Sequence, residues 1–478
     1  MVLNRDYGII GCPIFNQIFF HGRVKVNGML INELFEVESD AVVFYGENDS
    51  RVSLHDFQAA SEIVAWSLRE KGVRRASIVT DDACWFAIAL LACWIAGIEP
   101  VVPGLAGPQL MTREKARYGT ILARSQRKFR YGPGTLAIDE LVRGSGRIPF
   151  HHLDEKLEYS VFTSGSTGEP KEIRRSLGEV CAEASAIISH FRYVFDQTDC
   201  FASTVPCRHS FGLMFRVLIP MFVGLPTCRQ IFRSEENFLY KKYDSPFVVT
   251  SPSFLKRLSD SARGPRASGV VSSGGSLPRY AVDLGEKFFS CPITEIYGTT
   301  EYGAIGIRER KESNAVWRPF AGFSVSNSDD RRLQVLSPND GKVHVLDDLG
   351  NANPDGTFEF SGRSGRIVKL EGSALSLDRI EYLIRKDDFI RDAAACPITI
   401  GNRDCIGAAI VLSERGSDVL RASGSESMFL LNLRKRLSAA MDPVEIPRVV
   451  RIMGGFPEDP MGKLPEGWPG SLFRSIGY

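Results

Sequence analysis

Residues 159–171 read Tyr-Ser-Val-Phe-Thr-Ser-Gly-Ser-Thr-Gly-Glu-Pro-Lys, and this stretch carries the most information about the fold. A strand-like apolar pattern runs into small and hydroxyl-bearing residues, and Lys171 closes the loop. Such a loop offers backbone N–H groups and hydroxyl donors to phosphate oxygens, so it indicates an anion cradle. A Ser/Thr/Gly loop taken alone is more often a mobile turn. The spacing excludes a P-loop, because no segment reads Gly-x-x-x-x-Gly-Lys-Ser/Thr.

The chain before and after this loop alternates between helix and strand patterns. Apolar spacing predicts four successive segments, namely helix 60–68, strand 76–79, helix 85–95 ending at Gly97, and strand 100–103. The same alternation of helix and strand patterns recurs in residues 179–224 and 246–300. This alternation predicts an α/β fold whose mainly parallel sheets are covered by helices on both faces.

The pattern changes after Arg331. Short β-like runs at 333–336, 342–346 and 357–360 are separated by Asn-Asp-Gly and Pro-Asp-Gly turns, which predicts a small antiparallel part. Two glycines and two serines in Ser361–Arg366 separate two β-like runs. We therefore expect a large N-terminal domain, residues 1–362, and a small mobile α+β C-terminal domain, residues 363–478.

Composition restricts the class of protein. The 478 residues suffice for about two to four domains, and 24% charged and 44% hydrophobic residues are ordinary globular values. With 58 basic and 57 acidic residues, no overall charge indicates nucleic acid as a partner. The ten cysteines form no Cys-x-x-Cys pair. We expect buried thiols in a cytoplasmic protein with neither a signal peptide nor an integral membrane segment.

The loop at 159–171 resembles the phosphate loop of the ANL superfamily of adenylate-forming enzymes. That superfamily includes acyl- and aryl-CoA synthetases, peptide-synthetase adenylation domains and luciferases. The resemblance implies an ATP-phosphate site made by Thr163, Ser164, Gly165, Ser166, Thr167, Gly168 and Lys171.

A second motif concerns the acid. Residues 206–212, Pro-Cys-Arg-His-Ser-Phe-Gly, are similar to the family's Pro-x-x-His-x-x-Gly element, which implies that His209 borders the reacting carboxylate. A lone histidine is otherwise more typical of a structural role. Members that activate amino acids carry an aspartate near this element, and none stands between Pro206 and Gly212. The resemblance therefore disfavours an α-amino acid and leaves an aromatic or acyl carboxylic acid.

Two further motifs resemble the adenine side of the family's site. Ser273–Pro278 is similar to its adenine-side loop, which implies nucleotide contacts from Gly274, Gly275 and Ser276. Glu295–Glu301 matches Tyr-Gly-x-Thr-Glu. This match implies that Tyr297 and Gly298 face adenine, that Thr300 bonds the α-phosphate, and that Glu301 is a ligand for Mg²⁺, which prefers carboxylate oxygens.

The C-terminal motifs complete the resemblance. Asp347–Gly350 and Phe360–Arg363 are similar to the family's Thr-Gly-Asp-Leu and Gly-Arg motifs, which implies that Asp348 accepts from the ribose hydroxyls and that Arg363 lies near the nucleotide. Asp347 departs from the usual glycine. Gly365 stands at the hinge position, where the family commonly has Asp or Lys; glycine tolerates hinge rotation but offers no salt bridge. Alone, residues 347–350 would read as a β-turn.

The last two motifs concern the second half-reaction and the C-terminus. Lys369 and Gly372 resemble the family's Lys-x-x-Gly, which implies a tunnel for a pantetheine arm. Gly462-Lys463 resembles the motif whose lysine reaches the substrate carboxylate and the α-phosphate, although Pro465 stands close behind where most relatives have an arginine.

The resemblance as a whole implies an enzyme that uses ATP and Mg²⁺ to convert a small carboxylic acid to an acyl-adenylate. The acyl group then passes to coenzyme A or to the phosphopantetheine of an acyl carrier protein; the two acceptors share one tunnel, so the sequence does not separate them. The alternative is a non-catalytic nucleotide-binding homologue, which the altered residues at 347, 365 and 465 motivate.

Overall fold

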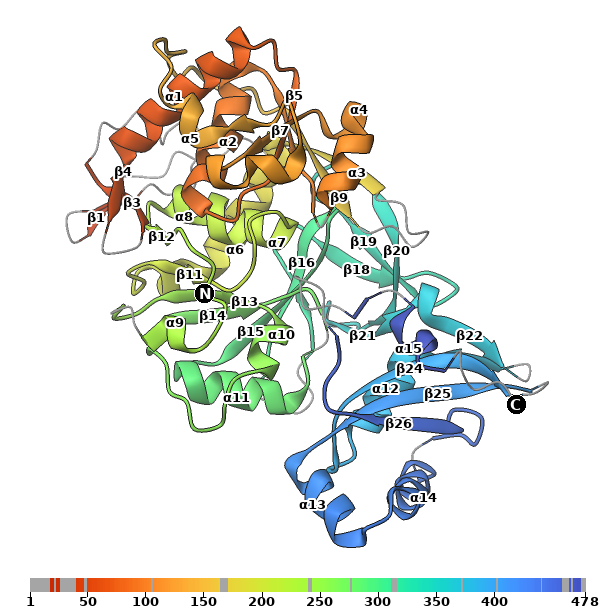
Figure 1. Ribbon diagram of the computed structural model, residues 1–478. Helices are drawn as coiled ribbons and strands as arrows, with labels where there is room; N and C mark the ends of the chain where they lie inside the picture. Colours follow the sequence, from red (N-terminus) through yellow and green to blue (C-terminus); the bar gives the residue numbers. More distant parts are fainter. Residues whose placement is uncertain are drawn as a thin grey trace, which may run out of the picture.

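The computed structural model describes most of the chain, namely residues 18–20, 23–25, 40–46, 50–104, 106–163, 171–239, 243–275, 277–310, 316–370, 373–400, 403–439, 441–457, 464–465 and 467–473. Helices and strands alternate through its first two thirds, and antiparallel sheets dominate the rest (Figure 1). The predicted α/β fold is confirmed.

Two large sheets form the N-terminal part. The six-stranded sheet has the order β10 (Lys171–Ser176), β9 (Glu158–Thr163), β6 (Glu99–Val102), β5 (Arg75–Ile78), β7 (Thr120–Ala123) and β8 (Leu136–Ala137). The nine-stranded sheet has the order β17 (Arg318–Pro319), β16 (Gly303–Glu309), β15 (Ile293–Thr299), β14 (Gly269–Ser272), β13 (Phe247–Thr250), β11 (Phe201–Ser203), β12 (Thr227–Cys228), β3 (Val42–Tyr45) and β4 (Arg51–Ser53). Both are parallel in their centres and antiparallel only at edges, as the alternation predicted.

The helices are α1 (Leu54–Glu70), α2 (Ala83–Ala96), α3 (Pro108–Arg113), α4 (Lys115–Tyr118), α5 (Ile138–Leu141), α6 (Leu177–Phe195), α7 (Ser210–Gly212), α8 (Ile219–Val223), α9 (Glu236–Leu239), α10 (Pro252–Lys256), α11 (Arg279–Phe289), α12 (Leu377–Arg385), α13 (Glu414–Ser423), α14 (Glu426–Leu437) and α15 (Trp468–Ser471). Helices α1 to α11 belong to the part of the chain that holds these sheets, and α12 to α15 belong to the C-terminal part. Helix α6 contacts β10 in one large sheet and β16 in the other. One hydrophobic core therefore takes side chains from both sheets and from α1, α2 and α6.

Helix α2 shows how the sequence sets an element of this core. Asp82 caps its first turn by accepting from the backbone N–H groups of Cys84 and Trp85, and Gly97 ends it in the left-handed conformation with φ 68°. Thirteen of its side chains are buried, because the helix is apolar on every face. The predicted core helix is confirmed, and it begins two residues earlier than its apolar run.

The remaining sheets are small. A four-stranded antiparallel sheet contains β18 (Ser324–Asn327), β19 (Arg332–Leu336), β20 (Val343–Ala352) and β21 (Phe358–Arg363), and two hairpins contain β1 (Ile18–Phe20) with β2 (Arg23–Lys25) and β22 (Ile367–Leu370) with β23 (Ser373–Ser376). Strands β24 (Ile390–Ile400), β25 (Arg403–Leu412) and β26 (Val449–Met453) form the last sheet. This sheet, α12 and α14 enclose a separate hydrophobic core that lies entirely within residues 368–452.

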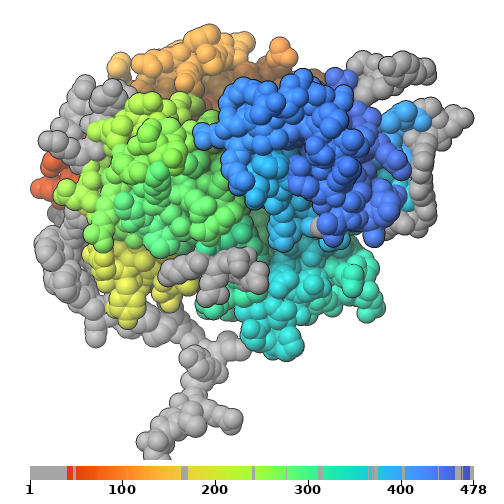
Figure 2. Space-filling view, turned by 90° about the horizontal axis from the view of Figure 1, so that it is seen from below, coloured from red at the N-terminus to blue at the C-terminus, as the bar shows by residue number. Residues whose placement is uncertain are grey.

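The C-terminal part lies against the N-terminal part. Figure 2 shows the surface of the last hundred residues next to that of residues 200–300. Among the residues that the structure describes, no helix combines the length and the apolar character that crossing a bilayer would require. Of the nine cysteines described, eight are buried, as expected for structural thiols.

Candidate active site

The predicted site residues follow strands that end at one edge of the nine-stranded sheet. The loop with His209 follows β11, the loop with Gly274 and Gly275 follows β14, and Tyr297 and Gly298 lie near the end of β15. Because β11, β13, β14 and β15 run parallel, their carboxyl ends meet at the same edge. In open α/β sheets this edge is the usual ligand-binding crevice.

Tyr297, Asp348 and Arg363 form one hydrogen-bonded group. The Tyr297 hydroxyl donates a short hydrogen bond to Asp348, and Arg363 Nε donates to the other Asp348 oxygen at 3.2 Å. The Asp348 side chain is 6% exposed. Burial raises the pKa of this carboxyl above its usual range, although both donors oppose the rise. An acceptor carboxylate, an aromatic ring and a guanidinium are thus held together.

Lys171 and Glu301 form a second group. Lys171 Nζ lies 2.9 Å from Glu301 Oε1, and their side chains are 61% and 35% exposed. The hydrogen bond and the charge of Glu301 raise the pKa of Lys171, and Tyr302 and Asp347 add to this effect. The lysine that ends the predicted phosphate loop therefore faces the carboxylate predicted to bind Mg²⁺.

The turn that carries Thr300 and Glu301 depends on two glycines. It joins β15 to β16, and the register shifts at Tyr297 and Gly298. A Cβ on Gly298 would lie 2.2 Å from the carbonyl oxygen of Gly303, and Gly303 itself has φ 78°. Only glycine fits this close approach, which explains the residue type at 298 in Tyr-Gly-x-Thr-Glu.

Local contacts support His209 and the loop predicted to lie on the adenine side. His209 precedes α7, and its Nδ1 accepts from the backbone N–H of Phe211 at 3.4 Å. Gly274 has φ 96° with open space around it. Behind this loop, Arg310 Nη2 donates to the Leu277 carbonyl oxygen at 2.7 Å, and Glu295 in turn accepts from Arg310 Nε at 2.6 Å.

Several predicted residues lie outside the described residues. These are Ser164, Gly165, Ser166, Thr167, Gly168, Ser276, Gly372 and Lys463, and for Thr163 and Lys369 only the backbone is described. Thr163 ends β9 and pairs with Lys171 across the hairpin, so the predicted phosphate loop spans β9 and β10. Lys369 lies in β22 opposite Ala374.

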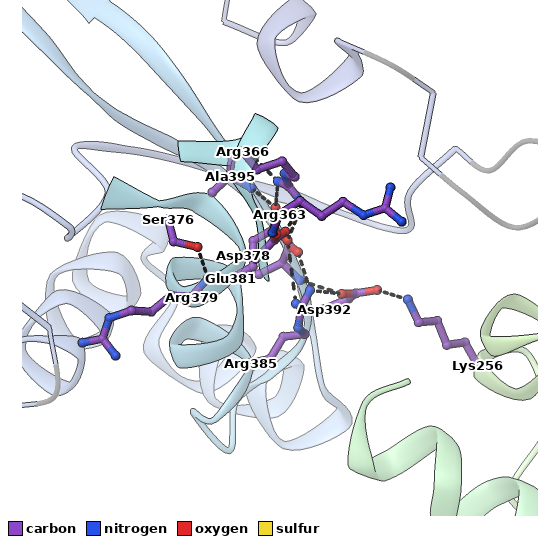
Figure 3. A network of polar contacts seen from close by, with 11 residues as sticks. Lys256, Arg363, Arg366, Ser376, Asp378, Arg379, Glu381, Arg385, Asp392 and Ala395 are labelled. Carbon is purple, nitrogen blue, oxygen red and sulfur yellow. Dashed lines mark hydrogen bonds and ion pairs between the residues drawn. The ribbon is translucent and has the colours of Figure 1, made fainter. Parts of the chain in front are cut away.

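A polar network joins the two parts of the chain (Figure 3). Lys256 Nζ at the end of α10 lies 2.8 Å from Asp392 Oδ2 in β24, and Arg391 donates to the Lys256 carbonyl oxygen and lies over the Tyr280 ring. Asp392 also accepts from Arg385 at 3.2 Å. The network reaches Arg363, the partner of Asp348, through Arg385–Glu381, Glu381–Arg366, Arg366–Asp378 and the hydrogen bond from Arg363 N to Asp378.

The sequence patterns did not predict the ion pairs that support the candidate site. Glu295 with Arg308 and Arg310, Lys256 with Asp392, and the buried pair Arg175–Glu183 were not predicted. One signal was present for Glu295, because a carboxylate in the strand-like stretch Ile293–Ile296 must be paired when it is buried. No local signal identifies the partners of the others.

The side chains of this site suit a metal ion that binds together with the nucleotide. The described residues contain no group of three or more His, Cys, Asp or Glu side chains able to enclose a metal. Mg²⁺ beside ATP needs one or two carboxylates, since phosphate oxygens and water supply the other ligands. Glu301, partly exposed and next to Lys171, fits such a single ligand.

Known proteins resemble this chain in sequence and in fold. Residues 148–357 match the family model described as AMP-binding enzyme. The 4-coumarate–CoA ligase of Cereibacter sphaeroides is 26% identical over 250 residues, which cover 52% of this chain and 59% of that ligase. The ATP-bound structure of MatB from Rhodopseudomonas palustris superimposes with a TM-score of 0.79 at 16% identity, covering 94% of this chain and 99% of that one. For a benzoate CoA ligase from Burkholderia xenovorans LB400 the TM-score is 0.76 at 17% identity, covering 91% and 98%.

Proposed function

We propose that this chain is a member of the ANL superfamily of adenylate-forming enzymes, that it uses ATP to activate a carboxylic acid as an acyl-adenylate, and that it passes the acyl group to a thiol. The acceptor is coenzyme A or the phosphopantetheine of a carrier protein, and the acid is aromatic or acyl. The observation that carries the proposal is the convergence of Lys171, Glu301, Tyr297, Asp348 and Arg363.

The first half-reaction needs positioning and charge neutralisation rather than covalent catalysis. The substrate carboxylate attacks the α-phosphorus of ATP, and pyrophosphate leaves. Asp348 accepts from the ribose hydroxyls, Tyr297 and Gly298 face the adenine, and Thr300 donates to the α-phosphate. Lys171 and the loop before it neutralise the phosphates, and Lys463 contacts both reacting groups. His209 borders the acid.

Glu301 would hold the Mg²⁺ that accompanies ATP, and this ion would supply positive charge to the phosphates. The ion pair with Lys171 supports this assignment, since it shows that the Glu301 carboxylate faces a cation. Binding of MgATP would replace Lys171 as the partner of Glu301, and Lys171 would then turn to the phosphates.

Glu301→Gln is expected to raise the Mg²⁺ concentration needed for half-maximal activity and to lower the rate about 10-fold or more, because an amide is a weaker ligand for a hard cation. The measurement is pyrophosphate exchange as a function of Mg²⁺ at fixed ATP. Glu309→Gln, at the far end of β16, is the matched control. An unchanged Mg²⁺ requirement in Glu301→Gln removes this residue from the metal site.

The second half-reaction involves the C-terminal part, which we propose to be a mobile domain that begins at residue 363. Its separate core supports this division. Gly365 supports the hinge, because a Cβ there would meet no atom within 4 Å. Rotation about this point would withdraw Lys463 and bring the loop with Lys369 and Gly372 to the site, where Gly372 admits the pantetheine arm.

Lys256→Met is expected to destabilise the present orientation of the C-terminal part relative to the N-terminal part. The substitution removes the cation that pairs with Asp392 between the two parts. The pair is partly exposed, so we expect a shift of about threefold to fivefold in the equilibrium between orientations. Small-angle X-ray scattering and protease cleavage near residues 361–366 measure this shift. Lys128→Met, which breaks a pair with Glu140 inside the N-terminal part, is the control. Equal cleavage rates in both variants would contradict a holding role for Lys256.

The proposed function is tested by incubating the protein with ATP, Mg²⁺, coenzyme A and single acids from a panel of benzoates, cinnamates, fatty acids and dicarboxylates. The expected products are AMP, pyrophosphate and one acyl-CoA thioester, identified by mass spectrometry. Formation of AMP and acyl-adenylate without a CoA thioester would indicate that the acceptor is a carrier protein and not coenzyme A. Absence of AMP with every acid would favour the non-catalytic alternative.

A further inference from the structure

The turn that carries Thr300 and Glu301 is anchored from inside the protein by a residue of another element. Glu183 in α6 accepts from the backbone N–H of Ala304, the second residue of β16, with an N–O distance of 2.8 Å. The other oxygen of Glu183 lies 2.7 Å from Arg175 Nη1. The Arg175 and Glu183 side chains are 3% and 7% exposed, so both charges are buried.

Gly303 allows the carboxylate to lie this close. A Cβ at residue 303 would lie 2.2 Å from one Glu183 oxygen, and the φ of 78° disfavours any other residue as well. The local sequence also fixes the position of Glu183. Ser176 and Glu179 form a reciprocal capping box that sets the first turn of α6 directly after β10, and Glu183 follows one turn later.

Strand β10 therefore holds the turn from two sides. Lys171 and Arg175 are four residues apart on this strand and share one face of it. Lys171 reaches Glu301 at the exposed end, whereas Arg175 reaches Ala304 through Glu183 at the buried end. The strand that ends the phosphate loop is thus connected to both ends of the turn that carries Thr300 and Glu301.

We propose that Glu183, held by Arg175, is a positioning residue that fixes the Thr300–Glu301 turn relative to strand β10, an inference that rests on the proposed function. A buried ion pair is poor evidence for stability alone, because apolar residues of similar volume often replace such a pair without loss. The hydrogen bond to Ala304 is different, since an apolar residue cannot accept it. The proposal assigns the role of Glu183 to that acceptor oxygen.

Two double variants separate positioning from stability. Arg175→Met with Glu183→Leu removes both charges and the acceptor, whereas Arg175→Met with Glu183→Gln removes both charges and keeps an amide oxygen for Ala304. Thermal unfolding of both is compared with that of the wild type. Activity is followed as pyrophosphate exchange, with kcat and the KM for ATP determined separately. Amide hydrogen exchange of the peptide covering residues 299–305 reports on the turn without requiring activity.

The Leu variant is expected to lose about 100-fold in kcat, the effect of a misplaced catalytic group, with a change in the KM for ATP of less than about threefold. Its turn should exchange amide hydrogens faster than that of the wild type. The Gln variant should retain kcat within about threefold and keep the wild-type exchange of the turn. Equal activity in the two variants, or equal hydrogen exchange of their turns, would overturn the proposal.

A failure of the positioning role of Glu183 can be distinguished from a failure of the proposed function. A wild-type protein that shows no pyrophosphate exchange with any acid would contradict the proposed function. The anchoring of Ala304 by residue 183 would still be decided by hydrogen exchange in the same variants. Should either double variant fail to fold, Glu183→Gln and Glu183→Met give the same comparison, since both leave Arg175 without its carboxylate partner and only Gln keeps an acceptor for Ala304.

Discussion

Asp348→Ala is expected to lower acid activation by about 100-fold or more, since the residue is proposed to accept from both ribose hydroxyls and each hydrogen bond to a charged group contributes about 1.5–3 kcal/mol. The substitution also frees Tyr297 and Arg363, which Asp348 now holds together. The effect should appear in both the KM for ATP and kcat. Pyrophosphate exchange over a range of ATP concentrations is the measurement.

Asp347→Ala provides the matched control for this prediction. Asp347 is the exposed neighbour in the same strand, whereas Asp348 is buried. We expect the control to keep its activity within about threefold, in line with the small effects of surface substitutions. Thermal unfolding of both variants separates loss of structure from loss of binding. Similar activities for the two variants would exclude Asp348 from the nucleotide site.

Lys463→Ala is expected to lower adenylate formation by about 100-fold to 1000-fold, the effect of removing one donor to developing charge. Transfer to a thiol from a supplied acyl-adenylate should be largely unchanged, because the lysine is proposed to act only in the first orientation. The two half-reactions are measured separately, as pyrophosphate exchange and as thioester formation. Lys435→Ala, in the last turn of α14, serves as the control. Equal losses in both half-reactions would contradict the alternation of domains.

The regular elements were predictable from local patterns. The helix predicted over 85–95 and the strands at 76–79, 100–103 and 333–336 are all present, because apolar spacing and flanking glycines report directly on burial. Residues 347–350 taken alone read as a turn, yet they lie within β20. There, pairing with β19 and β21 on both sides, together with a bulge at Leu349 and Gly350, outweighs the turn-forming composition.

The site was predictable only in its local motifs. The Tyr-Gly-x-Thr-Glu match led to Tyr297 and Glu301, and the Asp-Leu match led to Asp348, because each motif is short and contiguous. The partners of these groups are remote in sequence. Lys171 and Glu301 are 130 residues apart, Glu183 and Ala304 are 121 apart, and Lys256 and Asp392 are 136 apart. Such pairs depend on how strands and helices pack, which no local pattern specifies.

Acid-dependent exchange of labelled pyrophosphate into ATP tests the central claim most directly, because only reversible formation of an acyl-adenylate produces it. The measurement uses the 478-residue chain with ATP, Mg²⁺ and each acid of the panel, in the absence of any thiol. We predict exchange with at least one aromatic or acyl acid, no exchange without acid, and loss of the signal in Asp348→Ala but not in Asp347→Ala. Exchange that is absent with every acid, or equally fast without acid, would contradict the account.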